Sequence, residues 1–255
     1  MTEQFCVVGS PISHSKSPVI HNACFRFLAR DAFYFASEVT HLSRFLAERE
    51  DIAGLSVTMP LKEQAFEIST TLDPVALATG NVNTLIKTPG GWQGFNTDVF
   101  GLTQATSELS FKTLAILGTG SSARSALVAF SNHESVIWGR NRASSETLAA
   151  EHGAISVPLE DALSCDLVIS TLPKGALRQI GSTDSIYPGT LMDISYSNES
   201  NGALKFSGGQ ISGLDMLAWQ ALMQQRIFAG RKPSEAFENE SKMLEVIMSA
   251  LNMTK

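Results

Sequence analysis

Residues 113–130, TLAILGTGSSARSALVAF, contain an apolar strand pattern, a glycine turn and a helical pattern in direct succession. Gly118, Gly120 and Ala123 give the turn the spacing G-x-G-x-x-A. The first glycine permits a tight turn, the second lets a pyrophosphate approach the backbone, and the small third residue allows close helix–strand packing. Plain turns also carry this spacing, but a second strand pattern follows at 135–139. The stretch therefore predicts a Rossmann-type domain with a dinucleotide site at the helix N-terminus.

The end of that second strand pattern indicates which dinucleotide is bound. An NAD site usually has a carboxylate there for the ribose 2′-hydroxyl, whereas an NADP site has cations for the 2′-phosphate. Residues 138–145 read WGRNRASS, with Arg140 and Arg142 on either side of Asn141 and no carboxylate. A guanidinium donates two parallel hydrogen bonds to a phosphate. The pattern favours NADP, although two solvated surface arginines would give the same letters.

Strand and helix patterns alternate along the rest of the chain. The strand patterns lie at 5–9, 32–39, 54–59, 82–87, 113–118, 135–139, 166–170 and 190–195. Such alternation predicts an α/β fold with βαβ units and parallel sheet. Turns at 88–98 and 206–215 divide the chain into an α/β domain at 1–98, a nucleotide domain at 99–212 and two helices at 213–255. Two helices cannot form a domain alone, so we expect them to pack on another block, the second with Pro233 near its first turn.

The composition excludes several classes of partner. The 255 residues carry a net charge of −6 at pH 7 and contain no apolar run that could cross a bilayer. We therefore expect a small-molecule ligand rather than nucleic acid or a membrane, and a cytoplasmic protein, since the first residues lack a signal-peptide pattern. Cys6, Cys24 and Cys165 are widely spaced in apolar stretches, which predicts buried thiols and no metal site.

Residues 11–22, PISHSKSPVIHN, precede a helical pattern and hold more polar groups than a turn needs. Ser17 before Pro18 is a good helix N-cap, which is a purely structural explanation. That explanation does not cover the Ser and Lys at 15–16. A helix N-terminus lined by hydroxyls binds carboxylate or phosphate, so the stretch also predicts an anion pocket. His21 falls on the apolar side of the helix and is expected to be structural.

The stretch GLSVTMPLKEQAF at 54–66 combines a strand with the start of a helix. It delivers Thr58 to the strand end and Lys62 to the first helical turn. A lysine at that end opposes the helix macrodipole, which prefers anions there. The position favours a lysine used for proton transfer. A solvent-facing Lys62 paired with Glu63 or Glu67 is the structural alternative.

A possible hairpin brings further polar residues together. The segments GNVNTL at 80–85 and GFNTDVFG at 94–101 flank the turn TPGGW at 88–92. If that turn forms a β-hairpin, the polar side chains at the strand ends come close to one another. Read alone, such residues are ordinary turn chemistry. The side chains concerned are Asn83, Thr84, Asn96, Thr97 and Asp98.

Together these stretches resemble the shikimate dehydrogenase family, in the same order along nearly the whole chain. The segments SKS, SVTMPLK, NT, FNTDVFG, GTGSSAR and GLDMLAWQ match the family's S-K-S, N-V-T-x-P-x-K, N-T, D-N-T-D-G, glycine-rich cofactor loop and G-L-x-M-L-x-x-Q. The resemblance implies an N-terminal α/β substrate domain and a Rossmann-type NADP domain. It also implies that the C-terminal helices pack back on the first domain.

The resemblance further implies roles for individual residues. The expected catalytic pair is Lys62 and Asp98. The expected substrate-binding residues are Ser15, Ser17 and Thr58 for a carboxylate, Asn83 and Gln220 for ring hydroxyls, and Tyr196. The expected cofactor-binding residues are Gly118, Gly120, Ser121, Ser122, Ala123, Arg140, Asn141, Arg142 and Gly213.

The chain departs from the family pattern at several positions. Ser56 replaces the usual Asn, so one hydrogen bond to a ring hydroxyl is expected to be shortened, carried by water or lost. Phe95 replaces an Asp, and Val99 replaces a Gly. Gly139 replaces an Asn and puts the exact 2′-phosphate contacts in question. None of these changes falls on the catalytic pair.

By this resemblance the expected activity is that of an NADP-dependent oxidoreductase, the reversible reduction of 3-dehydroshikimate to shikimate. This step belongs to the shikimate pathway, which leads to chorismate and the aromatic amino acids. One alternative is a quinate/shikimate dehydrogenase that uses NAD, and another is a nonenzymatic relative that only binds a shikimate-like molecule. A monomer or homodimer is expected.

Overall fold

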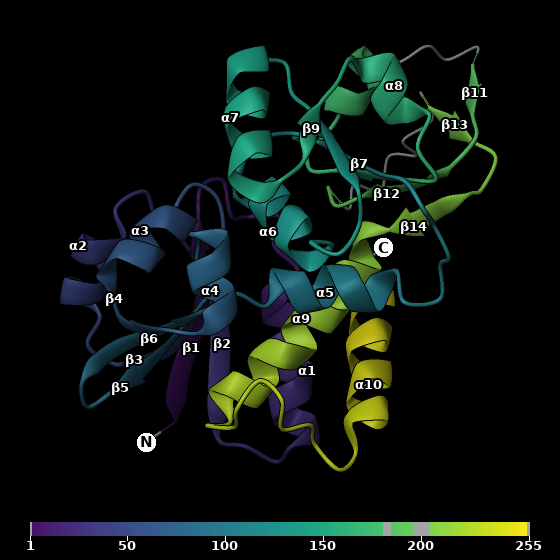
Figure 1. Cartoon of the computed structure of the whole chain (residues 1–255). Helices are drawn as coiled ribbons and strands as arrows, with labels where there is room; N and C mark the ends of the chain where they lie inside the picture. Colours follow the sequence, from purple (N-terminus) through teal and green to yellow (C-terminus); the bar gives the residue numbers. More distant parts are fainter. Residues whose placement is uncertain (1, 181–184, 196–203, 254–255) are drawn as a thin grey trace. The chain divides into compact units, whose positions relative to one another are not determined.

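The computed structural model describes residues 2–180, 185–195 and 204–253. The chain forms two compact units. The first unit joins residues 1–100 to residues 218–255, and the second holds residues 101–217. The C-terminal helices therefore belong with the N-terminal α/β fold (Figure 1).

The first unit contains a six-stranded sheet of order β2-β1-β3-β5-β6-β4. Its strands are β1 (Glu3–Gly9), β2 (Ala32–Glu38), β3 (Ile52–Val57), β4 (Ser69–Leu72), β5 (Thr84–Thr88) and β6 (Gly91–Phe95). β1 is parallel to β2 and β3, and β4 is parallel to β6, whereas β5 is antiparallel to both its neighbours. The parallel pairing expected from the strand–helix alternation is thus interrupted at β5. A hairpin reverses the chain after Thr88 and pairs Thr84 with Phe95, and its first strand, β5, lies between β3 and β6 and runs opposite to both.

Helices cover both faces of this sheet. They are α1 (Ser17–Phe27), α2 (Leu42–Glu48), α3 (Lys62–Ile68), α4 (Pro74–Thr79), the start of α5 (Asp98–Ala105), most of α9 (Gly213–Phe228), and α10 (Glu240–Asn252). Alternate side chains of β1 point to opposite faces. Cys6 and Val8 enter a core with residues of α2 and α3, while Phe5 and Val7 pack in another with Phe228 of α9. None of the described helices is long and apolar enough to span a membrane.

The second unit contains a six-stranded, wholly parallel sheet of order β14-β12-β10-β7-β8-β9. Its strands are β7 (Leu114–Leu117), β8 (Ser135–Trp138), β9 (Ile155–Ser156), β10 (Leu167–Ser170), β12 (Thr190–Asp193) and β14 (Gln210–Ser212), beside a small pair, β11 (Ile186–Tyr187) and β13 (Lys205–Phe206). The described helical elements of this unit are α6 (Ser121–Ala129), α7 (Arg142–His152), α8 (Leu159–Leu163), a 3₁₀ turn at Ala176–Gln179, the rest of α5 and the start of α9. Leu114 and Ile116 enter one core, and Ala115 and Leu117 enter another. Apolar strands buried on both faces confirm the Rossmann-type prediction.

Two helix starts differ from their predictions. Ser17 is the first residue of α1 rather than its N-cap, because the Lys16 carbonyl accepts the first helical hydrogen bond from Ile20. Lys16, the N-cap, makes no side-chain capping bond, and the backbone N–H of Ser17 donates to Ser15 Oγ at 3.3 Å. Pro233 lies outside α10, and its carbonyl instead accepts a hydrogen bond from Arg226.

All three cysteines are free and buried, as predicted. Burial raises the pKa of Cys6 and of Cys24 to about 12. Cys6 and Cys24 belong to the first unit and Cys165 to the second. The described residues contain no group of three or more His, Cys, Asp or Glu side chains placed to hold a metal ion.

Candidate active site

Lys62 and Asp98 form a buried ion pair in the first unit. Lys62 is the first residue of α3 and Asp98 the first of α5. The Lys62 Nζ lies 2.5 Å from Asp98 Oδ2, with the two residues 8% and 5% exposed. The solvent-facing alternative for Lys62 is therefore wrong, since Asp98 is its partner. The Asp98 carboxylate suits a helix N-terminus, whereas the lysine opposes the dipole of its own helix and is compensated by the carboxylate.

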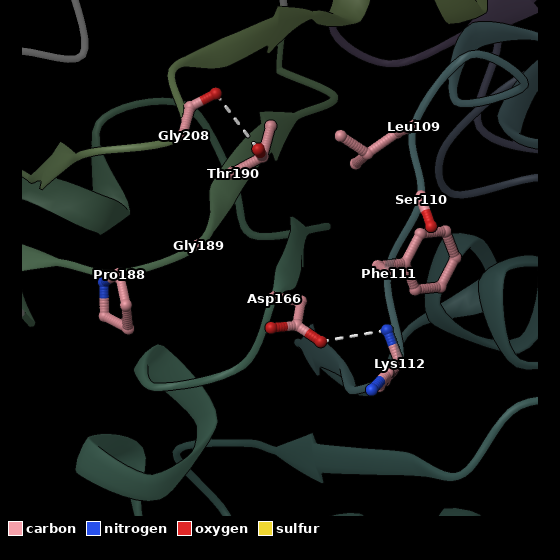
Figure 2. A pocket seen from close by; sticks show the side chains of 9 residues that line it. All are labelled: Leu109, Ser110, Phe111, Lys112, Asp166, Pro188, Gly189, Thr190 and Gly208. Atoms are coloured by element: carbon pink, nitrogen blue, oxygen red, sulfur yellow. Dashed lines mark hydrogen bonds between the residues drawn. The ribbon is translucent and has the colours of Figure 1, made fainter.

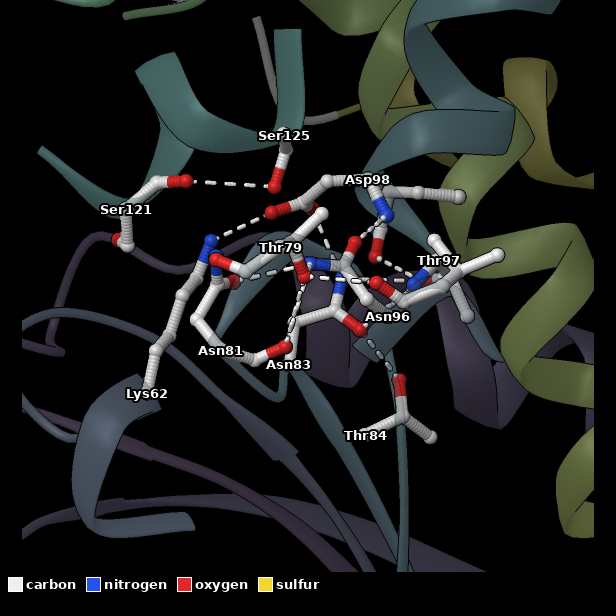
Figure 3. Close-up of polar contacts among 12 residues, drawn as sticks. Lys62, Thr79, Asn81, Asn83, Thr84, Asn96, Thr97, Asp98, Ser121 and Ser125 are labelled. Carbon is white, nitrogen blue, oxygen red and sulfur yellow. Dashed lines mark hydrogen bonds and ion pairs between the residues drawn. The ribbon is translucent and has the colours of Figure 1, made fainter. Parts of the chain in front are cut away.

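The hairpin places Asn83 against the same carboxylate. Asn83 precedes β5, and Thr97 and Asp98 follow β6, so the pairing of the two strands brings them together as predicted. Asn83 Nδ2 donates to Asp98 Oδ1 at 2.8 Å and to Thr97 Oγ1 at 3.0 Å, and its Oδ1 accepts from the backbone N–H of Thr97 at 2.9 Å. Figure 3 shows these side chains converging around the carboxylate. Both carboxylate oxygens of Asp98 thus have a buried donor.

Asn96 fixes the start of α5. Its Oδ1 accepts the backbone N–H of Asp98 at 3.0 Å, while its Nδ2 donates to Thr79 Oγ1 and Asn81 Oδ1, both at 2.9 Å. These contacts connect α4 to the segment that carries Asp98 (Figure 3). The sequence singled out Asn96 but missed Thr79. The only sequence signal is the clustering of polar residues beside Val82, within an otherwise apolar stretch.

Helix α9 brings two glutamines to this network. Gln220 is 7% exposed, and its Oε1 accepts a hydrogen bond from Thr97 Oγ1 at 3.3 Å. Gln224 is 1% exposed and donates from Nε2 to Thr84 Oγ1 at 2.8 Å. Gln224 was missed by the sequence reasoning. The signal was present, because residues four apart share one face of a helix and Gln220 was already singled out.

The residues expected to hold a carboxylate lie at the ends of β1 and β3. These strands are parallel neighbours, so the segments that follow them emerge at one edge of the sheet. Gly9 packs closely on Thr58, since a Cβ built on the glycine would lie 2.4 Å from the Thr58 Cγ2. Ser17 is buried, and Ser15 and Thr58 are partly exposed. Tyr196, the remaining predicted substrate residue, lies outside the described residues.

The glycine loop of the second unit has the properties of a phosphate cradle. Gly118 has φ of +120°, and a Cβ there would lie 2.3 Å from Thr171 Oγ1, so only glycine fits. A Cβ at Gly120, by contrast, would meet no atom within 4 Å, which leaves room for a ligand to approach the backbone. Ala123 is fully buried against the sheet, and Ser121 and Ser122 begin α6. The backbone N–H groups of that helix start can bind an anion.

The two arginines that follow β8 have different surroundings. Asn141 is the N-cap of α7, and its Oδ1 accepts the N–H of Ser144 at 3.2 Å. Arg142 is bonded to Glu146 at 2.7 Å on the helix surface. Arg140 is exposed and precedes the helix. The Arg142 guanidinium is therefore already paired with a carboxylate, and the expected role of either arginine toward a 2′-phosphate stays a prediction.

Gly213 begins α9, and its identity follows from packing. A Cβ there would lie 2.5 Å from the carbonyl oxygen of Asp193 at the end of β12. The glycine thus allows the helix start to approach the carboxyl end of the sheet. Its expected role toward the cofactor stays a prediction.

A cavity of about 440 Å³ in the second unit lies at the amino ends of the sheet strands, opposite the ends that lead into the glycine loop (Figure 2). Its lining includes Lys112, Asp166 and Gly189, which precede the strands β7, β10 and β12. Ligands of open α/β sheets bind beyond the carboxyl ends of the strands, and this cavity is at the amino ends. The Asp166 carboxylate accepts the backbone N–H groups of Lys112 and Thr113, both at 2.9 Å, so it has a structural role.

Comparisons with known proteins agree with this geometry. Residues 7–85 match the family model of the shikimate dehydrogenase substrate binding domain. Shikimate dehydrogenase (NADP(+)) of Hyphomonas neptunium is 34% identical over 96% of this chain and 99% of its own length. The Staphylococcus aureus enzyme of the same name is 32% identical over 89% of this chain and 93% of its own.

Solved structures give the same result. Shikimate 5-dehydrogenase of Thermus thermophilus, solved in complex with NADP(H) and shikimate, is 29% identical with a TM-score of 0.75, over 97% of this chain and 99% of its own. Shikimate dehydrogenase of Mycobacterium tuberculosis is 27% identical with a TM-score of 0.83, over 99% of this chain and its full length. The chain belongs to the shikimate dehydrogenase family.

Proposed function

We propose that this protein catalyses the reversible, NADPH-dependent reduction of 3-dehydroshikimate to shikimate, a step toward chorismate and the aromatic amino acids. The observation that carries the proposal is the buried Lys62–Asp98 pair, whose carboxylate is also bonded to Asn83. The names of the relatives and the ligands of the Thermus thermophilus complex support the choice of substrate and cofactor. A cytoplasmic location and a monomeric or homodimeric state stay predictions.

In this proposal Lys62 is the proton donor. Reduction of a carbonyl adds a hydride to carbon and a proton to oxygen, and an ammonium group can both stabilise the developing oxyanion and protonate it. Asp98 fixes the ammonium group through its contact at 2.5 Å. Because both residues are largely withdrawn from water, the ion pair acts in a medium of low dielectric constant, where charge–charge interactions are strong.

The other polar residues orient the substrate. Asn83 and Gln220 hold ring hydroxyls, and the hydroxyls of Ser15, Ser17 and Thr58 hold the carboxylate. Holding the substrate at several points keeps its carbonyl in a reactive position, which affects the rate as well as the affinity. Tyr196 is kept as a substrate-binding residue on the resemblance alone.

The second unit is proposed to bind NADP through the glycine loop and the end of β8. The fit rests on Gly118 and Gly120, whose turn leaves the N-terminus of α6 open to a pyrophosphate. Ser121, Ser122 and Ala123 belong to the same helix start, and Arg140, with Asn141 and Arg142, would face the 2′-phosphate. When bound, the nicotinamide supplies the hydride.

The test is an initial-rate assay of four pairs, shikimate or quinate with NADP⁺ or NAD⁺, followed at the absorbance of the reduced nicotinamide. We expect the highest kcat/KM with shikimate and NADP⁺. A higher kcat/KM with NAD⁺ would overturn the cofactor assignment, and a preference for quinate would overturn the substrate assignment. Turnover with none of the pairs, together with shikimate binding in calorimetry, would identify a nonenzymatic binding protein instead.

A further inference from the structure

A continuous chain of buried side chains in the first unit runs from Tyr34 on β2 to Asn83. Tyr34 OH donates to Ser56 Oγ at 2.5 Å, and Ser56 Oγ donates to Gln224 Oε1 at 2.7 Å. Gln224 Nε2 donates to Thr84 Oγ1 at 2.8 Å, and Thr84 Oγ1 donates to Asn83 Oδ1 at 2.8 Å. Every member is at most 5% exposed. The chain therefore ends on the amide that contacts the Asp98 carboxylate.

The direction of each hydrogen bond in this chain is determined by its neighbours. A hydroxyl has a single proton, so Ser56 can donate to Gln224 only if Tyr34 donates to Ser56. Likewise, Thr84 can donate to Asn83 only if Gln224 presents its NH₂ group to Thr84. Gln224 therefore decides which group Thr84 presents to Asn83.

The Asn83 backbone carbonyl, which can only accept, fixes the orientation of the Gln224 amide, because Gln224 Nε2 donates to it at 3.3 Å, and His21 complements that orientation. The His21 Nε2 lies 3.1 Å from Gln224 Oε1, and its Nδ1 lies 2.7 Å from Gln225 Nε2. An amide oxygen only accepts and an amide NH₂ only donates, so these partners assign a neutral imidazole with the proton on Nε2. Burial lowers the pKa of His21 to about 3, which keeps the ring neutral. Gln224 Oε1 thus has two donors and cannot turn toward Thr84 without losing both.

Given the proposed function, we infer that Gln224 is a positioning residue that acts through Thr84 to fix the orientation of the Asn83 amide toward Asp98. If the Asn83 amide were reversed, its oxygen would face Asp98 Oδ1, and two acceptors would stand where a donor now contacts a carboxylate at 2.8 Å. The Thr84 proton and the Thr97 N–H both point to Asn83 Oδ1 and oppose that reversal.

The same contacts assign Ser56 to this chain rather than to a ligand. Its single proton goes to Gln224, its oxygen receives the Tyr34 proton, and it is 5% exposed. The effect of Ser56 on catalysis is therefore indirect, through the orientation of Gln224.

The decisive variant is Thr84→Val, which keeps the side-chain shape and removes the hydroxyl between Gln224 and Asn83. We expect KM for shikimate to rise and kcat/KM for shikimate to fall about fivefold to tenfold, the loss of one hydrogen bond. KM for NADP⁺ stays unchanged, because only the orientation of a substrate-binding amide is altered. Thr84→Ser, which retains the hydroxyl, restores the wild-type constants.

Thr106→Val is the matched control. Thr106 is a buried threonine just after α5, and its hydroxyl donates to the Leu102 carbonyl at 3.0 Å. The substitution makes the same chemical change and causes a comparable loss of stability. A purely structural effect reduces the amount of folded enzyme, and therefore kcat, without changing either KM. Thr106→Val is expected to leave KM for shikimate unchanged.

Gln224→Glu provides a second test that keeps the shape of residue 224. The ionised carboxylate accepts but does not donate, so the Thr84 proton turns from Asn83 to residue 224, and the assay is run at high pH because burial favours the neutral carboxyl, which can still donate. We expect the same rise in KM for shikimate as in Thr84→Val, with no further rise in the double variant. Thermal unfolding monitored by near-UV circular dichroism establishes that each variant is folded at the assay temperature.

The outcomes separate this inference from the function on which it rests. A wild type without turnover of shikimate would overturn the proposed function and the inference with it. An active wild type whose folded Thr84→Val variant keeps its KM for shikimate would overturn the inference alone. A rise in KM that Thr84→Ser fails to reverse would do the same.

Discussion

In the first unit, Lys62, Asp98 and Asn83 are buried and already hydrogen-bonded to one another, whereas the glycine loop of the second unit presents backbone groups and open space. The first arrangement fixes side chains before a ligand arrives, which suits a site where charge develops during a reaction. The second arrangement has glycines without side chains, so a phosphate can come close to the backbone N–H groups. Substitutions in the first unit should therefore mainly lower turnover and stability, whereas those in the second unit should mainly change cofactor binding.

Removal of the lysine should have the largest effect. Lys62→Ala is expected to lower kcat by about two orders of magnitude or more, the usual contribution of a positioned acid, with a smaller change in KM. The measurement is the initial rate with shikimate and NADP⁺. Loss of one partner of a buried ion pair also destabilises the fold by about 3–5 kcal/mol.

The double variant Lys62→Met, Asp98→Asn separates the two effects, because it leaves no unpaired buried charge. It should recover stability relative to Lys62→Ala, measured by urea unfolding, and remain inactive. Retained turnover in either variant would remove Lys62 from the role of proton donor.

The arginines that follow β8 test the proposed cofactor site of the second unit. Arg140→Ala should lower the ratio of kcat/KM with NADP⁺ to that with NAD⁺ by about tenfold to a hundredfold, the value of a charge-assisted hydrogen bond. Arg142→Ala should lower it less, because the Arg142 guanidinium is bonded to Glu146 at 2.7 Å. An unchanged preference in Arg140→Ala would contradict the assignment of the 2′-phosphate site.

Two glycines of the same loop, Gly118 and Gly120, should respond differently to substitution by alanine. Gly120→Ala should leave the melting temperature unchanged, since a Cβ there meets no atom within 4 Å, and should weaken NADPH binding about tenfold. Gly118→Ala should destabilise the second unit by about 1–3 kcal/mol, because φ is +120° and the Cβ would meet Thr171. Fluorescence titration with NADPH and thermal unfolding measure the two effects, and equal behaviour of the two variants would disprove this interpretation of the loop.

The smallest expected effect is the pH dependence of stability that His21 causes. It tests the buried, hydrogen-bonded side chains of the first unit. Burial lowers the pKa of His21 from the ordinary histidine value of 6.5 to about 3 in the folded protein, so below pH 6.5 the unfolded chain binds a proton that the folded one does not. Stability is therefore complete above pH 6.5 and falls with decreasing pH, by about 1 kcal/mol between pH 7 and pH 5.5. Urea unfolding at several pH values measures this slope.

His152 must be controlled in that experiment, since burial and Arg124 also lower its pKa and give a slope of the same sign. We propose to compare His152→Gln with the double variant His152→Gln, His21→Phe. The slope should persist in the first and disappear in the second. A slope that survives the loss of His21 would show that other groups cause it.

Much of the arrangement was predictable because it depends on local sequence. The turn at 88–92 predicts the hairpin, and the hairpin alone brings Asn83 to Asp98. The spacing of Gly118 and Gly120 predicts the loop, since a positive φ and the absence of a Cβ are properties of the residue type. Lys62 was recognisable by its unfavourable place at a helix start.

The remaining features depend on partners far away in the sequence. Gln224 contacts Thr84 across 140 positions, and no local pattern specifies that pairing. Pro233 resembled a helix start, but its carbonyl is held by Arg226, and α10 begins only at Glu240. Ser17 was misplaced by one residue because the carbonyl of Lys16, rather than that of Ser17, accepts the first helical hydrogen bond, and no local side-chain pattern specifies that choice.

The three buried thiols can be used to measure how often the structure around each of them opens. A thiol reacts as the thiolate, and burial raises the pKa of Cys6 and Cys24 to about 12 and also raises that of Cys165. An alkylating reagent can therefore modify them only while the surrounding structure is open. Since Cys6 and Cys24 lie in the first unit and Cys165 in the second, peptide mapping after a timed pulse of reagent would yield a separate opening free energy for each unit. The wild-type sequence thus contains its own footprinting probes.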